Sequence, residues 1–146
     1  DERCGIVGIK EASGNVVQMV EIISMVPNDF VLVSGDDPLA VAVMGIGGRG
    51  LISVASNAAP AEMTQIIDLC RKGDFAAARK LHMWLLPFIQ VNFVEANPIP
   101  IKAAMAAMGL IEEVYRLPLV PPGDAARNKI MNVLQQVKLA GAAARA

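Results

Sequence analysis

The sequence predicts an α/β fold in which short parallel strands alternate with helices. Apolar runs flanked by glycine or turn residues recur at 6–9, 30–35 and 51–55, and each precedes a segment with apolar residues at helical spacing. Strands that are apolar throughout indicate a parallel sheet covered by helices. Three strands are too few to close a barrel, and a parallel eight-stranded barrel needs about 250 residues. We therefore expect these 146 residues to be part of a barrel.

The composition is unusually apolar for a soluble protein. Hydrophobic residues make up 54% of the chain and charged residues 18%, and the mean hydropathy is +0.46. Charge, proline or glycine interrupts every apolar stretch well short of the ~20 residues that a membrane-spanning helix needs. We therefore predict no membrane partner, and expect another subunit or another part of the same protein to cover the apolar surface. The first residue is Asp1, not Met, which indicates a processed N-terminus.

The charge and the cysteines of the chain argue against nucleic-acid binding and against a metal or redox site. A net charge of −1 with few, scattered aromatic residues provides no basic surface for nucleic acid. Cys4 and Cys70 are far apart and lack the spacing of a metal or redox site. We interpret them as small buried thiols in a reducing compartment, so the predicted localisation is cytoplasmic and no metal site is predicted.

Lys10 is the candidate catalytic residue, because it lies where the first predicted strand ends. Ile6, Val7 and Ile9 form that strand, which we expect to be buried, and Ser13-Gly14-Asn15 begins a helical pattern. Ligands of parallel α/β folds bind at such carboxyl ends of strands. An amine in apolar surroundings has a lowered pKa and can attack a carbonyl carbon. A structural lysine in an ion pair is the alternative.

The next two units repeat this pattern. A helix is predicted over 15–26, and the second strand over 30–35. Asp36 or Asp37 is available to cap a short helix whose first turn contains Pro38. The third strand is predicted from Leu51 to Ala55.

Only helices are predicted after the third strand. Two helices, Ala59 to Lys72 and Asp74 to about Phe93, complete the βα units, which we assign to residues 1–93. Pro87 predicts a kink or a break in the second of them. His82 is the only histidine, and we interpret it as an ordinary residue of a helix surface or interface.

Residues 94–146 are predicted to form a helical extension. An Ala- and Met-rich helix ends near Gly109, an extended connector covers 117–123, and the last helix runs from about Asp124 to Leu139.

Four motifs then occur in a characteristic order. They are GIKEASG at 8–14, SGDD at 34–37, GGRGLISV at 47–54 and NPIPIK at 97–102, and YRLPL at 115–119 fits with them. Together they resemble the dihydrodipicolinate synthase family, also called 4-hydroxy-tetrahydrodipicolinate synthase, of the class I pyruvate-dependent aldolases and lyases. That family forms a (β/α)8 barrel with extra C-terminal helices and is roughly twice this length. The resemblance begins at the sixth strand, so it implies strands six to eight and the C-terminal helices.

The resemblance implies a reaction for Lys10. In this family the lysine forms a Schiff base with pyruvate, and the derived enamine attacks the aldehyde of L-aspartate 4-semialdehyde on the way to lysine and diaminopimelate. The protonated imine is the electron sink, so neither a metal nor a cofactor is implied. Gly35 matches the glycine beside bound pyruvate, where a side chain would collide with the substrate. Ile52 matches a residue that lines the same pocket.

The resemblance also implies partners. Family members take a Gly-Thr-Thr-Gly-Glu loop, proton-relay tyrosines and a carboxylate-binding arginine from the N-terminal half of the barrel, and those motifs are absent from this sequence. The expected partners are therefore that N-terminal half and further copies of the protein, since homotetramers are common in the family. A non-catalytic half-barrel that dimerises through its open sheet, and a related sugar-acid aldolase, remain as alternatives.

Overall fold

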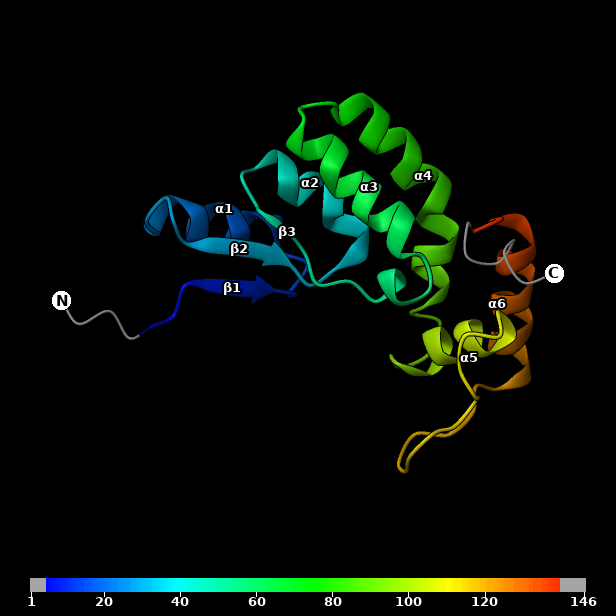
Figure 1. The fold of residues 1–146 in the computed structure, drawn as a ribbon. Coiled ribbons are helices and arrows are strands. Elements are labelled where there is room, and N and C mark those ends of the chain that lie inside the picture. The colour runs from blue at the N-terminus through cyan, green and yellow to red at the C-terminus, as the bar shows by residue number, and fades with distance from the viewer. Residues whose placement is uncertain (1–4, 140–146) are drawn as a thin grey trace.

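A parallel sheet of three strands, in the order β1-β2-β3, forms the N-terminal part of the computed structural model, which describes residues 5–139 (Figure 1). Strand β1 (Gly8–Glu11) pairs with β2 (Val31–Ser34), and β2 pairs with β3 (Gly50–Leu51). Helix α1 (Val16–Met25) connects the first pair, and helix α2 (Ala40–Gly45) the second. The predicted α/β class with parallel strands is confirmed.

The first strand is exposed, contrary to prediction. The side chains of Ile6, Val7 and Ile9 are 67%, 74% and 40% exposed. Ile6 and Val7 lie before β1, which begins at Gly8, two residues later than predicted. Ile9 is exposed because β1 is an edge strand that pairs only with β2 within the described residues.

The third strand is shorter than predicted. It ends at Leu51, and the chain then turns into the 3-10 helix η2 (Ala55–Asn57). The backbone N–H groups of Val54 and Ala55 donate to a carboxylate oxygen of Asp37, so they do not extend a strand ladder.

The other regular elements of the described chain are helices. They are the short 3-10 helix η1 (Asp37–Leu39), α3 (Pro60–Arg71), α4 (Phe75–Val91), α5 (Ile99–Ala107) and α6 (Asp124–Gln136). Asp74 caps α4 as predicted, since its Oδ1 accepts from the Ala77 N–H at 3.0 Å. The break considered at Pro87 is wrong: α4 continues through it, and Leu85, Phe88 and Ile89 beside it are fully buried in the core.

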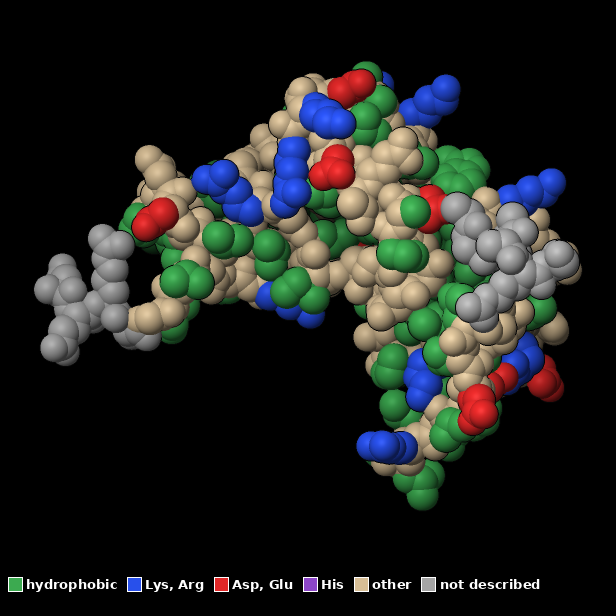
Figure 2. All heavy atoms as spheres, viewed as in Figure 1, with side chains coloured by type: hydrophobic (Ala, Val, Ile, Leu, Met, Phe, Trp, Pro, Cys, Tyr) green, Lys and Arg blue, Asp and Glu red, His purple; other side chains and the backbone are tan. Residues whose placement is uncertain are grey.

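The main core lies among the helices. Buried residues of α3, α4, α5 and α6 form one hydrophobic cluster that includes Ile66, Phe88, Ala104 and Ile130. A smaller cluster, Met19, Leu32 and Val43, joins β2 to α1 and α2. Helices α1 to α4 lie over one side of the sheet, whereas α5 and α6 lie beyond the carboxyl ends of the strands (Figure 1). The molecule is hollowed between the sheet and the C-terminal part (Figure 2).

Residues 110–123 form a narrow arm between α5 and α6 that projects from the body (Figure 1). Its base is fixed by polar contacts: Arg127 binds Glu113, and Lys102 Nζ donates to the Val114 carbonyl. Its tip presents Leu117, which is 88% exposed. The extended connector predicted over 117–123 is confirmed only in part, because residues 117–118 form a turn in which the Leu119 N–H donates to the Arg116 carbonyl. In the described part of the chain, no helix has the length and apolar character needed to cross a membrane.

Candidate active site

The carboxyl ends of the three strands bring Lys10, Gly35 and Ile52 to one pocket of about 380 Å³. Lys10 is the third residue of β1, Gly35 follows β2, and Ile52 follows β3. The strands are parallel, and Lys10 is paired with Val33, so their carboxyl ends meet at one edge of the sheet. All three residues predicted from the sequence thus line the same pocket.

Gly35 lies directly against the side chain of Lys10. A Cβ atom at this position would be 2.7 Å from Lys10 Cε and 2.6 Å from Ala12 Cβ, both far inside van der Waals contact. The sequence-based expectation was a collision with the substrate. The structure adds that a side chain at residue 35 would collide with Ala12 Cβ and with Lys10 Cε, so the glycine leaves room for both residues.

The wall opposite the strands comes from the C-terminal helices. Ile101, Lys102 and Met105 of α5 line the pocket, together with Asn97. Lys102 also contacts the arm, where its Nζ lies 5.1 Å from the centre of the Tyr115 ring. The residues that line the pocket include two lysines and no acidic side chain. Sequence reasoning placed Asn97 and Lys102 in a motif but gave them no role, and the motif itself was the available signal.

Lys10 is less enclosed than expected. The pocket was predicted to surround it with apolar groups, yet in this chain the lysine is an exposed residue. Its neighbours Ile9 and Ile52 are also exposed, because β1 has no neighbour on its outer edge among residues 5–139. The apolar enclosure that would favour a neutral amine is therefore incomplete in this chain.

The two aspartates after β2 have different environments. Asp36 is the N-cap residue of η1, but its side chain makes no capping hydrogen bond. Burial raises the pKa of its carboxyl, and the neighbouring charge of Asp37 raises it to a smaller extent. Asp37 does not cap its own helix as expected: it is 1% exposed, and its Oδ2 accepts from the N–H groups of Val54 and Ala55, each at 2.9 Å.

His82 is buried, so of the two predicted placements, a helix surface or an interface, the surface is wrong. It is 4% exposed, and its Nε2 lies 3.2 Å from the backbone oxygen of Asp37. Burial lowers the pKa of the imidazole, an effect that the Asp37 carbonyl and charge oppose. The histidine therefore tends to be neutral and packs α4 against the loop after β2.

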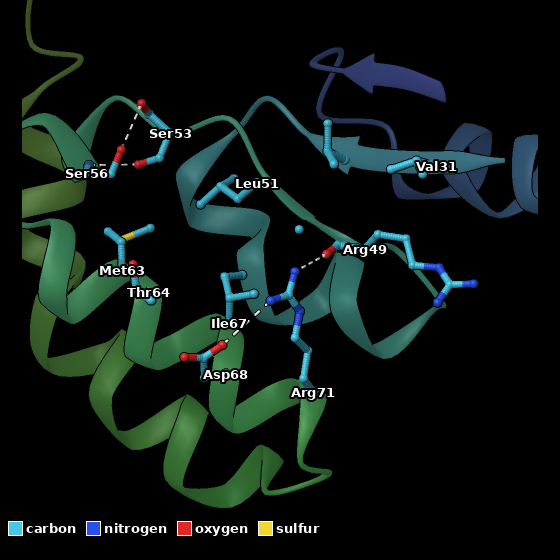
Figure 3. Close-up of a pocket in the computed structure, with 12 residues that line it drawn as sticks. Val31, Arg49, Leu51, Ser53, Ser56, Met63, Thr64, Ile67, Asp68 and Arg71 are labelled. Atoms are coloured by element: carbon cyan, nitrogen blue, oxygen red, sulfur yellow. Dashed lines mark hydrogen bonds and ion pairs between the residues drawn. The ribbon is translucent and has the colours of Figure 1, made fainter. Parts of the chain in front are cut away.

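A larger pocket of about 540 Å³ lies between β3 and α3 (Figure 3). Arg71 donates to the Arg49 carbonyl at 3.1 Å and lies 3.6 Å from Asp68, whereas the Arg49 guanidinium points away from the pocket. None of the three predicted site residues lines it. Because the lining of this larger pocket contains no lysine, the smaller pocket with Lys10 is the better candidate for the predicted chemistry.

The cysteines and possible metal ligands add no further site within the described residues. Cys70 is a free, buried thiol, as predicted, and burial raises its pKa, whereas Cys4 lies outside those residues. Between residues 5 and 139, no three His, Cys, Asp or Glu side chains are arranged to hold a metal ion.

Parallel strands joined by helical crossovers, with a pocket at their carboxyl ends, define an α/β protein with a candidate site at that edge of the sheet. Residues 2–137 match the model of the dihydrodipicolinate synthetase family, and the chain belongs to that family. The family predicted from the motifs is confirmed.

Two similar proteins are both named 4-hydroxy-tetrahydrodipicolinate synthase. The chain is 44% identical over 128 residues to the 4-hydroxy-tetrahydrodipicolinate synthase of Koribacter versatilis, covering 88% of this chain and 43% of that protein. It is 42% identical over 141 residues to the synthase of Chloroherpeton thalassium, covering 97% and 47%. The chain thus spans about half the length of the relatives it matches.

Solved structures agree with this fold. Dihydrodipicolinate synthase from Aquifex aeolicus superposes with a TM-score of 0.92 at 38% identity, over 94% of this chain and 47% of that chain. The protein from Thermotoga maritima gives a TM-score of 0.88 at 38% identity, over 90% and 46%. The fold of this chain is therefore that of about half of a dihydrodipicolinate synthase.

Proposed function

We propose that this chain is the C-terminal half of a 4-hydroxy-tetrahydrodipicolinate synthase and that Lys10 is its Schiff-base lysine. In this proposal residues 1–93 supply strands six to eight of the barrel, and residues 94–146 supply the helical extension. The order of elements supports the placement, since three βα units are followed only by helices in the described chain. The observation that carries the proposal is that Lys10, Gly35 and Ile52 line one pocket.

The proposed chemistry begins at the Lys10 amine. Its nitrogen attacks the ketone carbon of pyruvate, and loss of water leaves a protonated imine. A methyl proton then leaves to give an enamine, whose terminal carbon forms a bond to the aldehyde carbon of L-aspartate 4-semialdehyde. The aldehyde oxygen takes up a proton, and attack of the semialdehyde amine on the imine carbon closes the ring and releases Lys10.

Each pocket residue has a proposed part in this sequence. Gly35 keeps the space over Lys10 Cε open, so the amine can reach the bound ketone. Ile52 forms the neighbouring wall. Two lysines without an acidic neighbour favour a ligand that carries carboxylates, as pyruvate and aspartate semialdehyde do.

The proposal includes the protein partners, the substrates and the metabolic pathway of this chain. The N-terminal half of the barrel would cover the exposed β1 and contribute the residues that this chain lacks. Pyruvate and aspartate semialdehyde are the proposed substrates, without a metal or cofactor, in cytoplasmic lysine and diaminopimelate biosynthesis. We also propose a homo-oligomer, although one related structure is described as a monomeric dihydrodipicolinate synthase variant.

A non-catalytic half-barrel is the second candidate function. The exposure of Lys10 and of the apolar residues around it favours this candidate for the chain on its own.

Two chimeras with the Aquifex aeolicus enzyme test the proposal. In the first, this chain replaces the C-terminal segment of that enzyme, and in the second it replaces the N-terminal segment. We expect the first to form product from pyruvate and aspartate semialdehyde, and its Lys10→Arg variant to form none, because a guanidinium forms no imine with a ketone. The matched control is Lys129→Arg, which changes an exposed lysine of α6 away from the pocket.

The outcomes separate the candidates. Product from the second chimera alone would contradict the C-terminal placement. Two folded chimeras without product would favour the non-catalytic half-barrel. Product with sugar-acid aldehydes but not with aspartate semialdehyde would identify the related aldolase.

A further inference from the structure

Asp37 is a buried acid that the proposed reaction does not use. Its side chain is 1% exposed, and its Oδ2 accepts two hydrogen bonds of 2.9 Å from the N–H groups of Val54 and Ala55. Its Oδ1 is buried and has no hydrogen-bond partner among the described residues. Burying a carboxylate is costly, so its presence calls for a purpose that an apolar residue could not serve.

The contacts of Asp37 join three elements. The residue begins η1, directly after the end of β2 where Gly35 lies. Its carboxylate binds the chain just after β3, and its carbonyl oxygen lies 3.2 Å from His82 Nε2 on α4. Ser34 fixes the intervening loop, since its hydroxyl binds both the carbonyl and the N–H of Asp36.

The segment that Asp37 holds is a wall of the Lys10 pocket. Ile52, Ser53 and Val54 all line that pocket, and the two bound amides belong to Val54 and the next residue. Hydrogen bonds from backbone N–H groups to a carboxylate are stronger than those to a neutral acceptor. Without the carboxylate, the two amides would lose their hydrogen-bond acceptor. The pocket wall at residues 52–54 would then no longer be held at a fixed distance from Gly35.

We infer that Asp37 is a positioning residue, whose carboxylate holds the 52–55 segment against the end of β2 and so sets the shape of the Lys10 pocket. The catalytic part of this inference rests on the proposed Schiff-base function. The structural part does not, because it concerns only the two amides and their acceptor.

Two variants of Asp37 test the inference in the full 146-residue chain. Asp37→Ala removes the acceptor, whereas Asp37→Asn keeps the shape and one carbonyl oxygen. The control is Ile130→Ala, which empties a 1% exposed core position on α6 that does not line the pocket. The first readout is hydrogen exchange of the Val54 and Ala55 amides by NMR. The second is the rate at which borohydride traps pyruvate on Lys10.

We expect Asp37→Ala to speed exchange of these two amides at least tenfold relative to Ile130→Ala, with Asp37→Asn in between. We expect trapping to slow at least tenfold in Asp37→Ala, to recover partly in Asp37→Asn, and to stay near the wild-type rate in Ile130→Ala. Unchanged amide exchange in both Asp37 variants would overturn the inference, as would equal slowing of trapping in Ile130→Ala. If the wild-type chain traps no pyruvate, the proposed function fails for this chain, and the amide exchange still decides the positioning role.

Discussion

At the scale of single residues, the site depends on the absence of a side chain at Gly35. Resemblance could predict that a glycine belongs beside the substrate, and spacing could predict that Lys10 ends a strand. Neither could show that the glycine lies against Lys10 Cε, because that contact joins two strands whose register is fixed only in the folded sheet. The buried states of Asp37 and His82 were missed for the same reason, since each is bound by an element distant in sequence.

Gly35→Ala tests this contact. The new Cβ would lie 2.7 Å from Lys10 Cε and 2.6 Å from Ala12 Cβ, so we expect a destabilisation of about 1–3 kcal/mol, as for other overpacked sites. We expect pyruvate trapping to slow more than tenfold, because the lysine must leave its present position. Urea unfolding and the trapping rate measure the two effects.

Gly45→Ala is the matched control for that substitution. A Cβ at residue 45 would meet only Phe75 Cε1, at an ordinary contact distance of 3.8 Å. Its stability and trapping rate should equal or exceed those of the wild type. Equal trapping rates in the two variants would show that Gly35 does not make room for Lys10.

At the scale of elements, periodicity predicted the long helices well and the strands less well. Helices α3 and α4 carry repeated apolar faces and clear boundaries such as the Asp74 cap, so local sequence sufficed. The third strand ended early because the Asp37 carboxylate takes the amides that would have extended it. Pro87 did not break α4, because its flanking residues are held in the core.

The packing of α4 on the loop after β2 predicts a pH dependence. Burial lowers the pKa of His82 from its ordinary value of 6.5, so the unfolded chain binds this proton more readily than the folded chain. The stability contribution of the neutral imidazole is therefore present above pH 6.5 and is lost as the pH falls below it. We expect the urea concentration at the midpoint of unfolding to decrease when the pH is lowered from 7.5 to 5.5.

His82→Gln isolates this effect. A glutamine amide can still donate to the Asp37 carbonyl, but it does not titrate. The fall in urea midpoint between the two pH values should be smaller in this variant than in the wild type. An equal fall in both would assign the pH dependence to groups other than His82.

At the scale of the whole molecule, the apolar composition and the exposed first strand have one explanation. The chain spans about half the length of its relatives, and apolar side chains are exposed at residues 6 and 7, just before β1, and at residue 9 within it. Composition predicted that something else covers this surface, but it could not say which surface. In the proposed account, the other half of the barrel lies in the hollow between the sheet and the arm (Figure 2).

The central claim is that Lys10 forms an imine with pyruvate, and the most direct measurement is intact mass spectrometry after incubation with pyruvate and borohydride. Reduction fixes an imine as a stable adduct, and peptide mapping locates it. We expect one reduced pyruvate per chain on Lys10 and none in Lys10→Arg, with faster labelling when the remaining half of the barrel is supplied. An adduct on another lysine, or none even with that half present in a folded complex, would contradict the central claim.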